Sequence, residues 1–172
     1  MFIIVEGLDG SGKSTLCKKL AKHIPNSIVM KEDTMWLEAM KEMPEMAHDF
    51  FNNFCKYRVM YSNKVKKLLD KGYTVISDRY SPSTICYQLY RSDCERLREI
   101  YNRYSSKFIR PDYIFIMNTP IEVCRERVLA RGEEFDMEFM KSVEECYRMV
   151  QGMYDNVYYV ENFKQVLSIL KK

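Results

Sequence analysis

The stretch that decides the fold is Phe2-Ile3-Ile4-Val5-Glu6-Gly7-Leu8-Asp9-Gly10-Ser11-Gly12-Lys13-Ser14-Thr15. An apolar run leads into the spacing G-x-x-x-x-G-K-[ST], and residues 15–21 continue with the pattern of an amphipathic helix. Strand, glycine-rich loop and helix follow one another in the order that a phosphate-binding loop requires. The stretch therefore predicts a site for a nucleoside triphosphate.

The residue types in this loop fit the chemistry of phosphate binding. The glycines let the backbone adopt positive φ and turn its N–H groups toward phosphate oxygens. Lys13 can reach the β- and γ-phosphates, and the Ser14 hydroxyl can ligate Mg²⁺. The predicted ATP-binding residues are Gly7, Asp9, Gly10, Ser11, Gly12, Lys13, Ser14 and Thr15. A chance glycine-rich turn is the alternative, and the flanking strand and helix argue against it.

Length and composition indicate one domain, spanning residues 1–172. No apolar run approaches the roughly 18 residues of a membrane span, and the chain does not open with the pattern of a signal peptide. We therefore expect a soluble, cytoplasmic protein. The six cysteines include no C-x-x-C pair, which favours reduced thiols in the core.

Charge is mixed along the chain. The 27 basic residues are interleaved with 24 acidic ones, for a net charge of +3. This balance argues against a long nucleic acid as partner, because such a partner selects for a basic stripe. A small phosphorylated metabolite needs only local positive charge, which Lys13, Arg79 and residues 125–131 supply.

Strand-like and helical patterns alternate through the chain. The predicted strands are Phe2–Glu6, Ser27–Met30, Tyr73–Ser77, Asp112–Met117 and Val157–Val160. This alternation predicts an α/β fold with a parallel sheet covered by helices on both faces. The longest helix is expected from about Met46 to Asp70. Helix starts are predicted at Thr119 and Ser92, each the first residue of a capping box, and at Asn162.

A second motif, Val75-Ile76-Ser77-Asp78-Arg79-Tyr80, ends a strand with an acid and an arginine. The carboxyl ends of parallel strands face the ligand crevice, so Asp78 and Arg79 should lie beside the triphosphate. There the carboxylate could hold Mg²⁺ or its waters, and the guanidinium could clamp a second phosphate. A surface ion pair in a turn is the alternative, and it is weaker beside a phosphate-binding loop.

These segments resemble the thymidylate kinase family. Residues 5–15 are similar to the family's opening, and residues 78–88 to its D-R-Y…A-Y-Q segment. Residues 111–113, 119–123 and 127–132 are similar to its later features. The resemblance spans most of the chain. It implies a P-loop fold with a five-stranded sheet in the order 2-3-1-4-5, transfer of a phosphoryl group from ATP to a deoxynucleoside monophosphate, most of all dTMP, and a homodimer.

The resemblance also implies roles for individual residues. The substrate-binding residues it implies are Asp9 at the sugar 3′-hydroxyl, Phe54 stacked on the base, Arg58 at the base edge, Arg79 at the acceptor phosphate, and Thr84, Tyr87 and Gln88 around sugar and base. The catalytic residues are Lys13, Asp78, Arg127 and Arg131, and the Mg²⁺ ligands are Ser14 and Asp78. A short lid at about residues 131–136 would close over the transferring group.

The chain departs from the family pattern after the second strand and in the lid. Lys31 stands where the family has an arginine after the second strand. Residues 133–136 stand where a second Asp-Arg pair is expected in the lid. Position 10 is glycine and not arginine, which resembles the subgroup of the family whose catalytic cations come from the lid.

Two other functions stay open. Glu32, with Trp36 nearby, resembles the related deoxynucleoside kinases, in which a glutamate removes the proton of the nucleoside 5′-hydroxyl. Against this, those kinases have Glu-Arg-Ser where this chain has Asp78-Arg79-Tyr80. A nucleotide-dependent switch that signals by loop ordering is the third possibility. The chain lacks the N-K-x-D segment that reads guanine in such proteins, which disfavours it.

Overall fold

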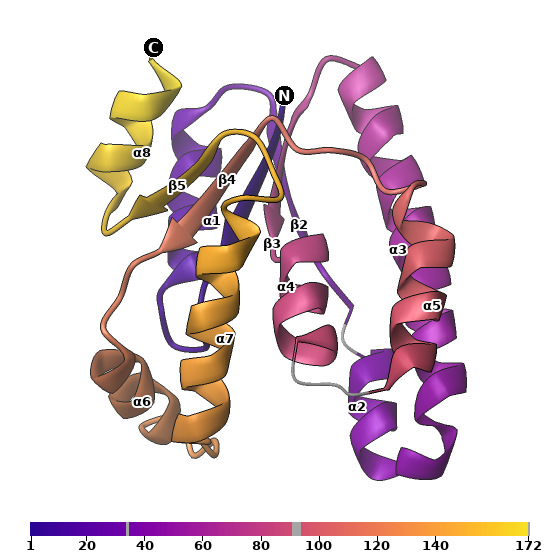
Figure 1. Ribbon diagram of the computed structural model, residues 1–172. Helices are drawn as coiled ribbons and strands as arrows, with labels where there is room; N and C mark the ends of the chain where they lie inside the picture. The colour runs from indigo at the N-terminus through magenta and orange to yellow at the C-terminus, as the bar shows by residue number, and fades with distance from the viewer. Residues whose placement is uncertain (34, 91–93, 172) are drawn as a thin grey trace.

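The computed structural model describes residues 1–33, 35–90 and 94–171, and it is built on a five-stranded parallel sheet (Figure 1). The strands lie in the order β2-β3-β1-β4-β5, which confirms the predicted order. The strands are β1 (Phe2–Glu6), β2 (Ser27–Lys31), β3 (Thr74–Asp78), β4 (Tyr113–Met117) and β5 (Val157–Val160). Each bound lies within one residue of the prediction.

β1 lies at the centre of the sheet because it is buried on both faces. All five of its residues are buried, and it pairs with β3 on one side and β4 on the other. In this register Val5 lies beside both Asp78 and Phe115. The carboxyl ends of three strands therefore meet at one edge of the sheet, where the loop after Glu6 begins.

Helices connect the strands, and their bounds agree with the predicted alternation. They are α1 (Lys13–His23), α2 (Met35–Glu42), the 3₁₀ turn η1 (Pro44–Met46), α3 (Ala47–Asp70), α4 (Ser81–Thr84) continued by the π-helical turn η2 (Ile85–Leu89), α5 (Glu95–Ser105), α6 (Ile121–Leu129), α7 (Met137–Val150) and α8 (Phe163–Leu170). The long helix predicted from about Met46 to Asp70 is thus α3, with its start displaced by one residue.

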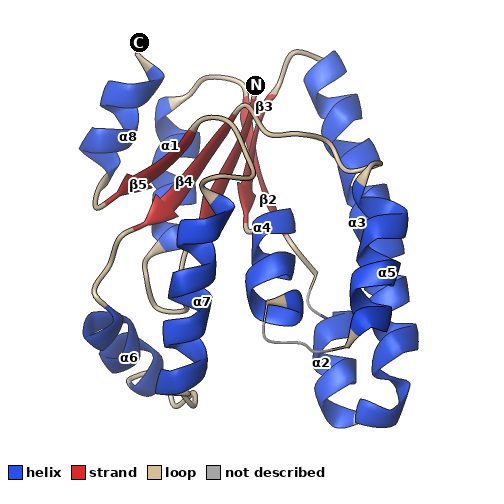
Figure 2. Cartoon of the chain, in the orientation of Figure 1, coloured by secondary structure: helices blue, strands red, loops and turns tan. Residues whose placement is uncertain are grey.

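Helices cover both faces of the sheet, as predicted (Figure 2). Alternate residues of a strand point to opposite faces. Ile3 and Val5 pack with Leu20 of α1 and Val166 of α8, while Ile4 packs with residues of α3 and α7 on the other face. A third cluster lies between α3 and α5, away from the sheet. It joins Phe51, Phe54 and Cys55 to Leu97 and Ile100.

The predicted helix starts had different outcomes. Asn162 caps α8, where its side chain accepts a hydrogen bond from the N–H of Gln165 at 3.2 Å. The capping box at Thr119 is wrong, because its hydroxyl instead donates to the carbonyl of Ser11 at 2.9 Å. The first two residues of the box predicted at 92–95 lie outside the described residues, and α5 itself begins at Glu95.

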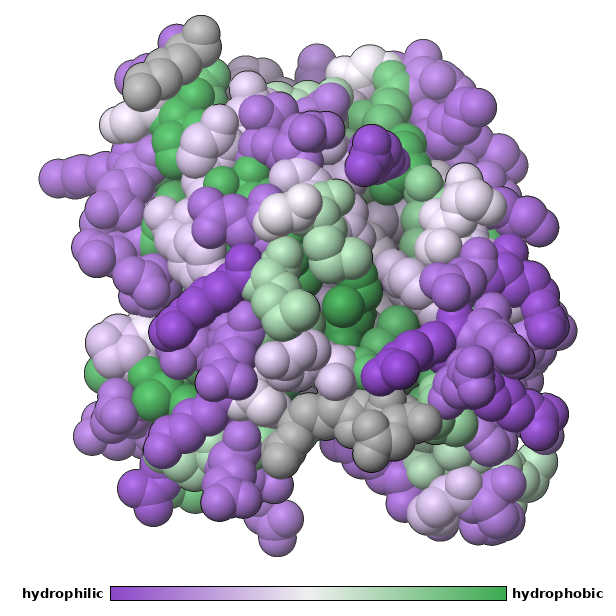
Figure 3. Space-filling view, in the orientation of Figure 1, coloured by the Kyte–Doolittle hydropathy of each residue, from purple (hydrophilic) through white to green (hydrophobic). Residues whose placement is uncertain are grey.

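The surface is mostly hydrophilic, as Figure 3 shows for one face. On that face hydrophobic residues gather over the middle, and the outline is notched below, between the end of the molecule that carries α6 and the end that carries α2. Within the described ranges, no helix has the length and apolar character needed to cross a membrane. All six cysteines are free thiols, five of them buried, in agreement with the sequence prediction.

Candidate active site

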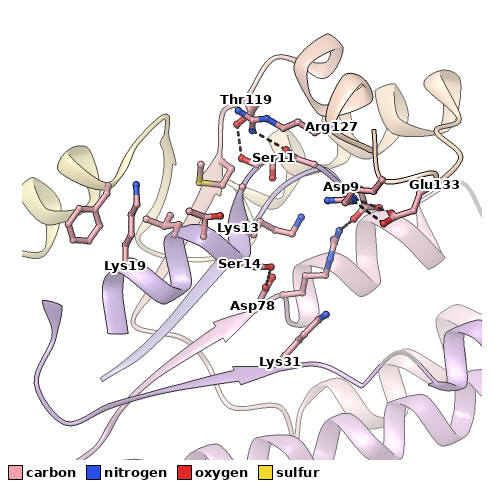
Figure 4. A pocket seen from close by; sticks show the side chains of 18 of the residues that line it. Asp9, Ser11, Lys13, Ser14, Lys19, Lys31, Asp78, Thr119, Arg127 and Glu133 are labelled. Carbon is pink, nitrogen blue, oxygen red and sulfur yellow. Dashed lines mark hydrogen bonds and ion pairs between the residues drawn. The ribbon is translucent and has the colours of Figure 1, made fainter. Parts of the chain in front are cut away.

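A pocket of about 1190 Å³ opens at the carboxyl edge of the sheet (Figure 4). It is lined by eleven of the residues predicted from sequence: Asp9, Gly10, Ser11, Gly12, Lys13, Ser14, Thr15, Asp78, Arg79, Arg127 and Arg131. They come from the loop after β1, the end of β3, and α6 with the segment that follows it. Motifs that lie far apart in the sequence thus share one cavity, as the parallel topology requires.

Two glycines give the phosphate-binding loop its shape. Gly10 and Gly12 have φ of 81° and 95°, in the left-handed region that glycine adopts without strain. A Cβ at Gly10 would lie 2.4 Å from the carbonyl oxygen of Cys124 in α6. The arginine that the family resemblance led us to consider at position 10 would therefore not fit against α6 as this chain packs it.

Lys13 extends along the loop into the pocket. Figure 4 shows it between Ser11 on one side and Asp78 on the other. Its Nζ donates a 2.7 Å hydrogen bond to the carbonyl of Leu8. Burial lowers the pKa of Lys13 from its ordinary 10.5 to about 7, and the nearby Arg79 charge acts in the same direction. A triphosphate would reverse this, because anionic oxygens favour the charged amine.

Ser14 and Asp78 form the candidate metal site. The Ser14 hydroxyl, at the start of α1, hydrogen-bonds to the carboxylate of Asp78 at the end of β3. Hydroxyl and carboxylate oxygens suit Mg²⁺, which is commonly held by one or two protein groups together with phosphate oxygens and water. Across the part of the chain that the structure describes, no group of three or more His, Cys, Asp or Glu side chains could hold a metal ion. The residues present therefore fit a magnesium that arrives with a nucleotide.

Asp9 and Arg79 form an ion pair across the pocket. Burial acts to raise the pKa of Asp9, but the positive charges of Arg79 and Lys13 outweigh it, so the pKa is lowered. Arg79 also donates to the hydroxyls of Ser83 at 3.0 Å and Tyr87 at 3.2 Å, and its guanidinium lies 4.6 Å from the centre of the Tyr87 ring. The guanidinium is thereby held from three sides while it still lines the pocket.

Arg58 and Glu32 form a second ion pair, deeper in the protein. The Arg58 side chain is 1% exposed and lies over the rings of Phe54 and Tyr80, 5.0 and 4.9 Å from their centres. Its Nε and Nη1 have no hydrogen-bond partner among the described residues. Burial raises the pKa of Glu32 to about 7, and the Arg58 charge opposes the shift. Glu32 lines the pocket, so this pair forms part of its wall.

The segment predicted as a lid joins α6 to α7. Arg131 makes a two-point contact with Glu133, at 2.9 and 3.1 Å, and both side chains are half exposed. Arg127 donates to the carbonyl of Gly10 at 3.1 Å. Asp136 caps α7 by accepting from the N–H of Phe139 at 2.9 Å. Part of the segment that departs from the family pattern thus has a structural role as a helix start.

Some predicted site residues lie outside the pocket. Those that do not line it are Gly7, Phe54, Arg58, Thr84, Tyr87 and Gln88. Phe54 has no exposed surface and packs in the cluster between α3 and α5. A base could stack on Phe54 only after its neighbours move. Thr84 is buried with no partner for its hydroxyl among the described residues, and Gln88 is half-buried.

Several residues around the site were not predicted. Glu6 is buried at the end of β1 and bonded to the segment after Arg79. Lys19, Thr119 and Phe163 line the pocket. The sequence carried a weak signal for Glu6 alone, since a carboxylate in an apolar central strand needs partners. Thr119 was predicted only as a helix start, and no local pattern indicated that Lys19 or Phe163 lines the pocket.

Comparison with known proteins agrees with this geometry. The family model described as thymidylate kinase matches residues 5–171. A probable thymidylate kinase from Methanocaldococcus jannaschii is 32% identical over 155 residues, covering 86% of this chain and 79% of the relative. This chain belongs to the thymidylate kinase family. It is accordingly a nucleoside monophosphate kinase.

Solved structures share the fold of this thymidylate kinase family member. The thymidylate kinase of Ehrlichia chaffeensis superposes with a TM-score of 0.72 at 24% identity, over 99% of this chain and 98% of that one. A deoxyadenosine kinase from M. mycoides, solved with dCMP and dCDP as products, gives 0.68 at 17% identity, over 99% and 97%. At these identities the likeness concerns the fold alone, which kinases of both classes share.

Proposed function

We propose that this protein transfers the γ-phosphoryl group of ATP, with Mg²⁺, to the 5′-phosphate of dTMP. The observation that carries the proposal is the placement of two cations in one pocket, Lys13 in the phosphate-binding loop and Arg79 at the end of β3. Two separate cationic positions suit two phosphate-bearing substrates, and transfer between them requires that both lie in one cavity.

The donor side is the loop and the first turn of α1. Backbone N–H groups of residues 10–15 would bind the phosphates, and Lys13 would stabilise the charge on the transferring group. Ser14 and Asp78 would hold Mg²⁺, which supplies charge neutralisation on the phosphate oxygens. The existing contact between the Ser14 hydroxyl and the Asp78 carboxylate supports this assignment, because it brings two oxygen ligands together.

The acceptor side begins at Arg79, which would bind the dTMP phosphate, with Asp9 near the sugar 3′-hydroxyl. Arg58 would bind the base edge. Nε and Nη1 of this buried arginine lack a hydrogen-bond partner within the described ranges, and this supports that role, because buried donors without partners are rare and favour a ligand. Phe54 would stack on the base after its neighbours between α3 and α5 move. Thr84, Tyr87 and Gln88 would line the sugar and base, with Tyr87 crowding a ribose 2′-hydroxyl.

Arg127 on α6 and Arg131 in the lid at about residues 131–136 would stabilise the transferring phosphoryl group. The exposed pair between Arg131 and Glu133 is of the kind that contributes little stability, so Arg131 can exchange Glu133 for phosphate oxygens. On the family resemblance alone, we also propose one domain over residues 1–172 and a cytoplasmic homodimer.

A deoxynucleoside kinase is the second candidate. The observation that favours it is that Glu32 lines the pocket and its pKa is raised to about 7, in the range of a general base. The ion pair with Arg58 weighs against it, because a carboxylate bound to a guanidinium is a poorer proton acceptor.

The test of the central observation is Arg79→Ala, with Arg103→Ala as control. Arg103 is an exposed arginine on α5 outside the pocket. We expect Arg79→Ala to raise the KM for dTMP or lower kcat by about 10², with the KM for ATP nearly unchanged. An unchanged dependence on dTMP would remove Arg79 from the acceptor site.

A further inference from the structure

Glu6 is a buried carboxylate that none of the roles above uses. It ends β1, next to the phosphate-binding loop, and none of its surface is exposed. Burial raises its pKa, while the Arg79 charge and hydrogen bonds from Ser83, Tyr80 and Tyr147 oppose the rise. A carboxylate in such a place is costly unless it is well bonded, so its partners indicate what it holds.

Three of the four hydrogen bonds to Glu6 come from the segment that follows Arg79. One carboxylate oxygen accepts from the N–H groups of Tyr80 at 2.8 Å and Ser83 at 3.3 Å. The other accepts from the Ser83 hydroxyl at 2.6 Å and the Tyr147 hydroxyl at 3.0 Å. Glu6 therefore ties the start of α4 to the central strand.

The backbone at Arg79 needs such support. Its φ is 72°, in the left-handed region that residues with a side chain rarely adopt. A strained residue of this kind persists where its surroundings over-determine it. The N–H of Arg79 donates to the carbonyl of Val5 at 3.0 Å, and the Ser77 hydroxyl donates to the carbonyl of Arg79 at 2.6 Å. The carboxylate of Glu6 holds the N–H of the next residue, Tyr80.

The Ser83 hydroxyl links Glu6 to the guanidinium itself. It has one proton, which it donates to Glu6, so its lone pairs are left to accept from Nη1 of Arg79 at 3.0 Å. The carboxylate thus sets the direction of the hydroxyl, and the hydroxyl sets the position of one edge of the guanidinium. The other edge, at Nη2, contacts Asp9 and Tyr87.

We propose that Glu6, acting through Ser83, is a positioning residue that fixes the Arg79 guanidinium for the acceptor phosphate. The inference rests on the proposed role of Arg79 in binding that phosphate. Glu6 does not touch the substrates. It acts by holding both the strained backbone and the side chain of the residue that does.

The test compares two serine-to-alanine variants on the same short helix. Ser81 and Ser83 are both buried, at 3% and 5% exposure, but the Ser81 hydroxyl bonds to Tyr154 at 3.0 Å and takes no part in the link. We expect Ser83→Ala to raise the KM for dTMP about tenfold while the KM for ATP stays within about twofold. Ser81→Ala should leave both unchanged. An equal rise in both variants would overturn the proposal.

A double-mutant cycle separates this proposal from the role of Arg79. If Ser83 acts through Arg79, then Ser83→Ala should have no further effect on kcat/KM for dTMP in an Arg79→Ala background. The same cost in both backgrounds would overturn the inference. If Arg79→Ala alone leaves the dTMP dependence unchanged, the proposed acceptor role fails instead.

Glu6→Gln tests directly whether the carboxylate is needed to position Arg79, and near-UV circular dichroism checks that the variant is folded. The N–H groups of Tyr80 and Ser83 can only donate, so the amide oxygen of glutamine should face them and its amide nitrogen should face the Ser83 hydroxyl. Because that nitrogen cannot accept the Ser83 proton, the variant should reproduce the rise in KM for dTMP. Wild-type kinetics for dTMP in folded Glu6→Gln would overturn the proposal. If this variant does not fold, the serine cycle alone decides.

Discussion

The carboxylate of Glu32 contacts the guanidinium of Arg58 in the interior, between the end of β2 and helix α3. The two side chains are 6% and 1% exposed. A buried ion pair contributes little net stability, but each partner depends on the other to offset the loss of water. The relationship therefore bears both on the choice of acceptor and on the stability of the fold.

The first prediction is that Glu32→Gln retains most of the activity with dTMP. A monophosphate acceptor attacks with an ionised oxygen and needs no base, and glutamine keeps the shape and an oxygen for Arg58. We expect kcat to fall by less than about tenfold, whereas loss of a general base costs roughly 10² to 10⁴. Steady-state rates of dTDP formation decide this. A fall in kcat of roughly 10² to 10⁴ would instead indicate that Glu32 acts as a general base.

Glu32→Ala should instead reveal the cost of an unpaired buried charge. It leaves the Arg58 guanidinium without an anionic partner, and changes of this kind typically cost about 3–5 kcal/mol. Urea denaturation should show a loss in the free energy of unfolding near that range, with Glu32→Gln well below it. If the two variants lose the same free energy of unfolding, then the hydrogen bond that glutamine can still accept from Arg58 contributes little to stability.

Lys13 leads to a prediction about protons. With a pKa of about 7, its amine is largely neutral at about pH 8 when no ligand is bound. A bound triphosphate favours the charged form, so ATP binding should take up protons at that pH. Calorimetry in buffers of different ionisation enthalpy measures the uptake. Folded Lys13→Met should show no proton uptake on binding ATP and no kinase activity. Proton uptake that persists in this variant would show that a group other than Lys13 binds the proton.

The same pKa shift makes stability depend on pH in a stated direction. Between about pH 7 and the ordinary pKa of 10.5, the unfolded chain holds a proton on Lys13 that the folded chain lacks, so folding becomes more favourable as pH rises. Below pH 7 both forms are charged and the full penalty of burial applies. Ligand-free Lys13→Met should therefore be more stable than wild type at pH 7, by a margin that shrinks toward pH 10. A constant margin would refute the shift.

Gly72, which follows α3, is a matched control for Gly10 in the phosphate-binding loop. Their φ values are 81° and 82°, but a Cβ at Gly10 would meet the Cys124 carbonyl at 2.4 Å, whereas one at Gly72 would meet nothing within 4 Å. Both alanine variants carry the strain of positive φ, of order 1 kcal/mol. Gly10→Ala should lose more, because backbone must move, and should also lose ATP binding. Equal free energies of unfolding for Gly10→Ala and Gly72→Ala would contradict this, because they would show that α6 moves away from the new Cβ with no loss of stability.

The sequence predicted those features that depend on neighbouring residues. The five strands, the phosphate-binding loop and the cap at Asn162 are all encoded within a few positions, and each is confirmed. The parallel topology then brought Lys13, Asp78 and Arg79 to one pocket, since strand ends of a parallel sheet share an edge.

Features that depend on distant partners were missed or misread. The Thr119 hydroxyl was predicted to cap a helix locally, but the carbonyl of Ser11, 108 residues away, accepts its proton. Glu6 is bonded to residues 74 to 141 positions away, which no local pattern encodes. The role of Phe54 as a base platform stays a prediction, because access to its ring depends on how α3 and α5 pack.

The most direct test of the central claim is a comparison of acceptors. ATP and Mg²⁺ are supplied with dTMP or with thymidine, and the products are resolved by chromatography. We predict formation of dTDP with a kcat/KM for dTMP at least about 10² above that for thymidine, because only the monophosphate carries the charge that Arg79 binds, and no turnover of ATP without an acceptor. Faster phosphorylation of thymidine, or hydrolysis of ATP that no acceptor stimulates, would contradict the account.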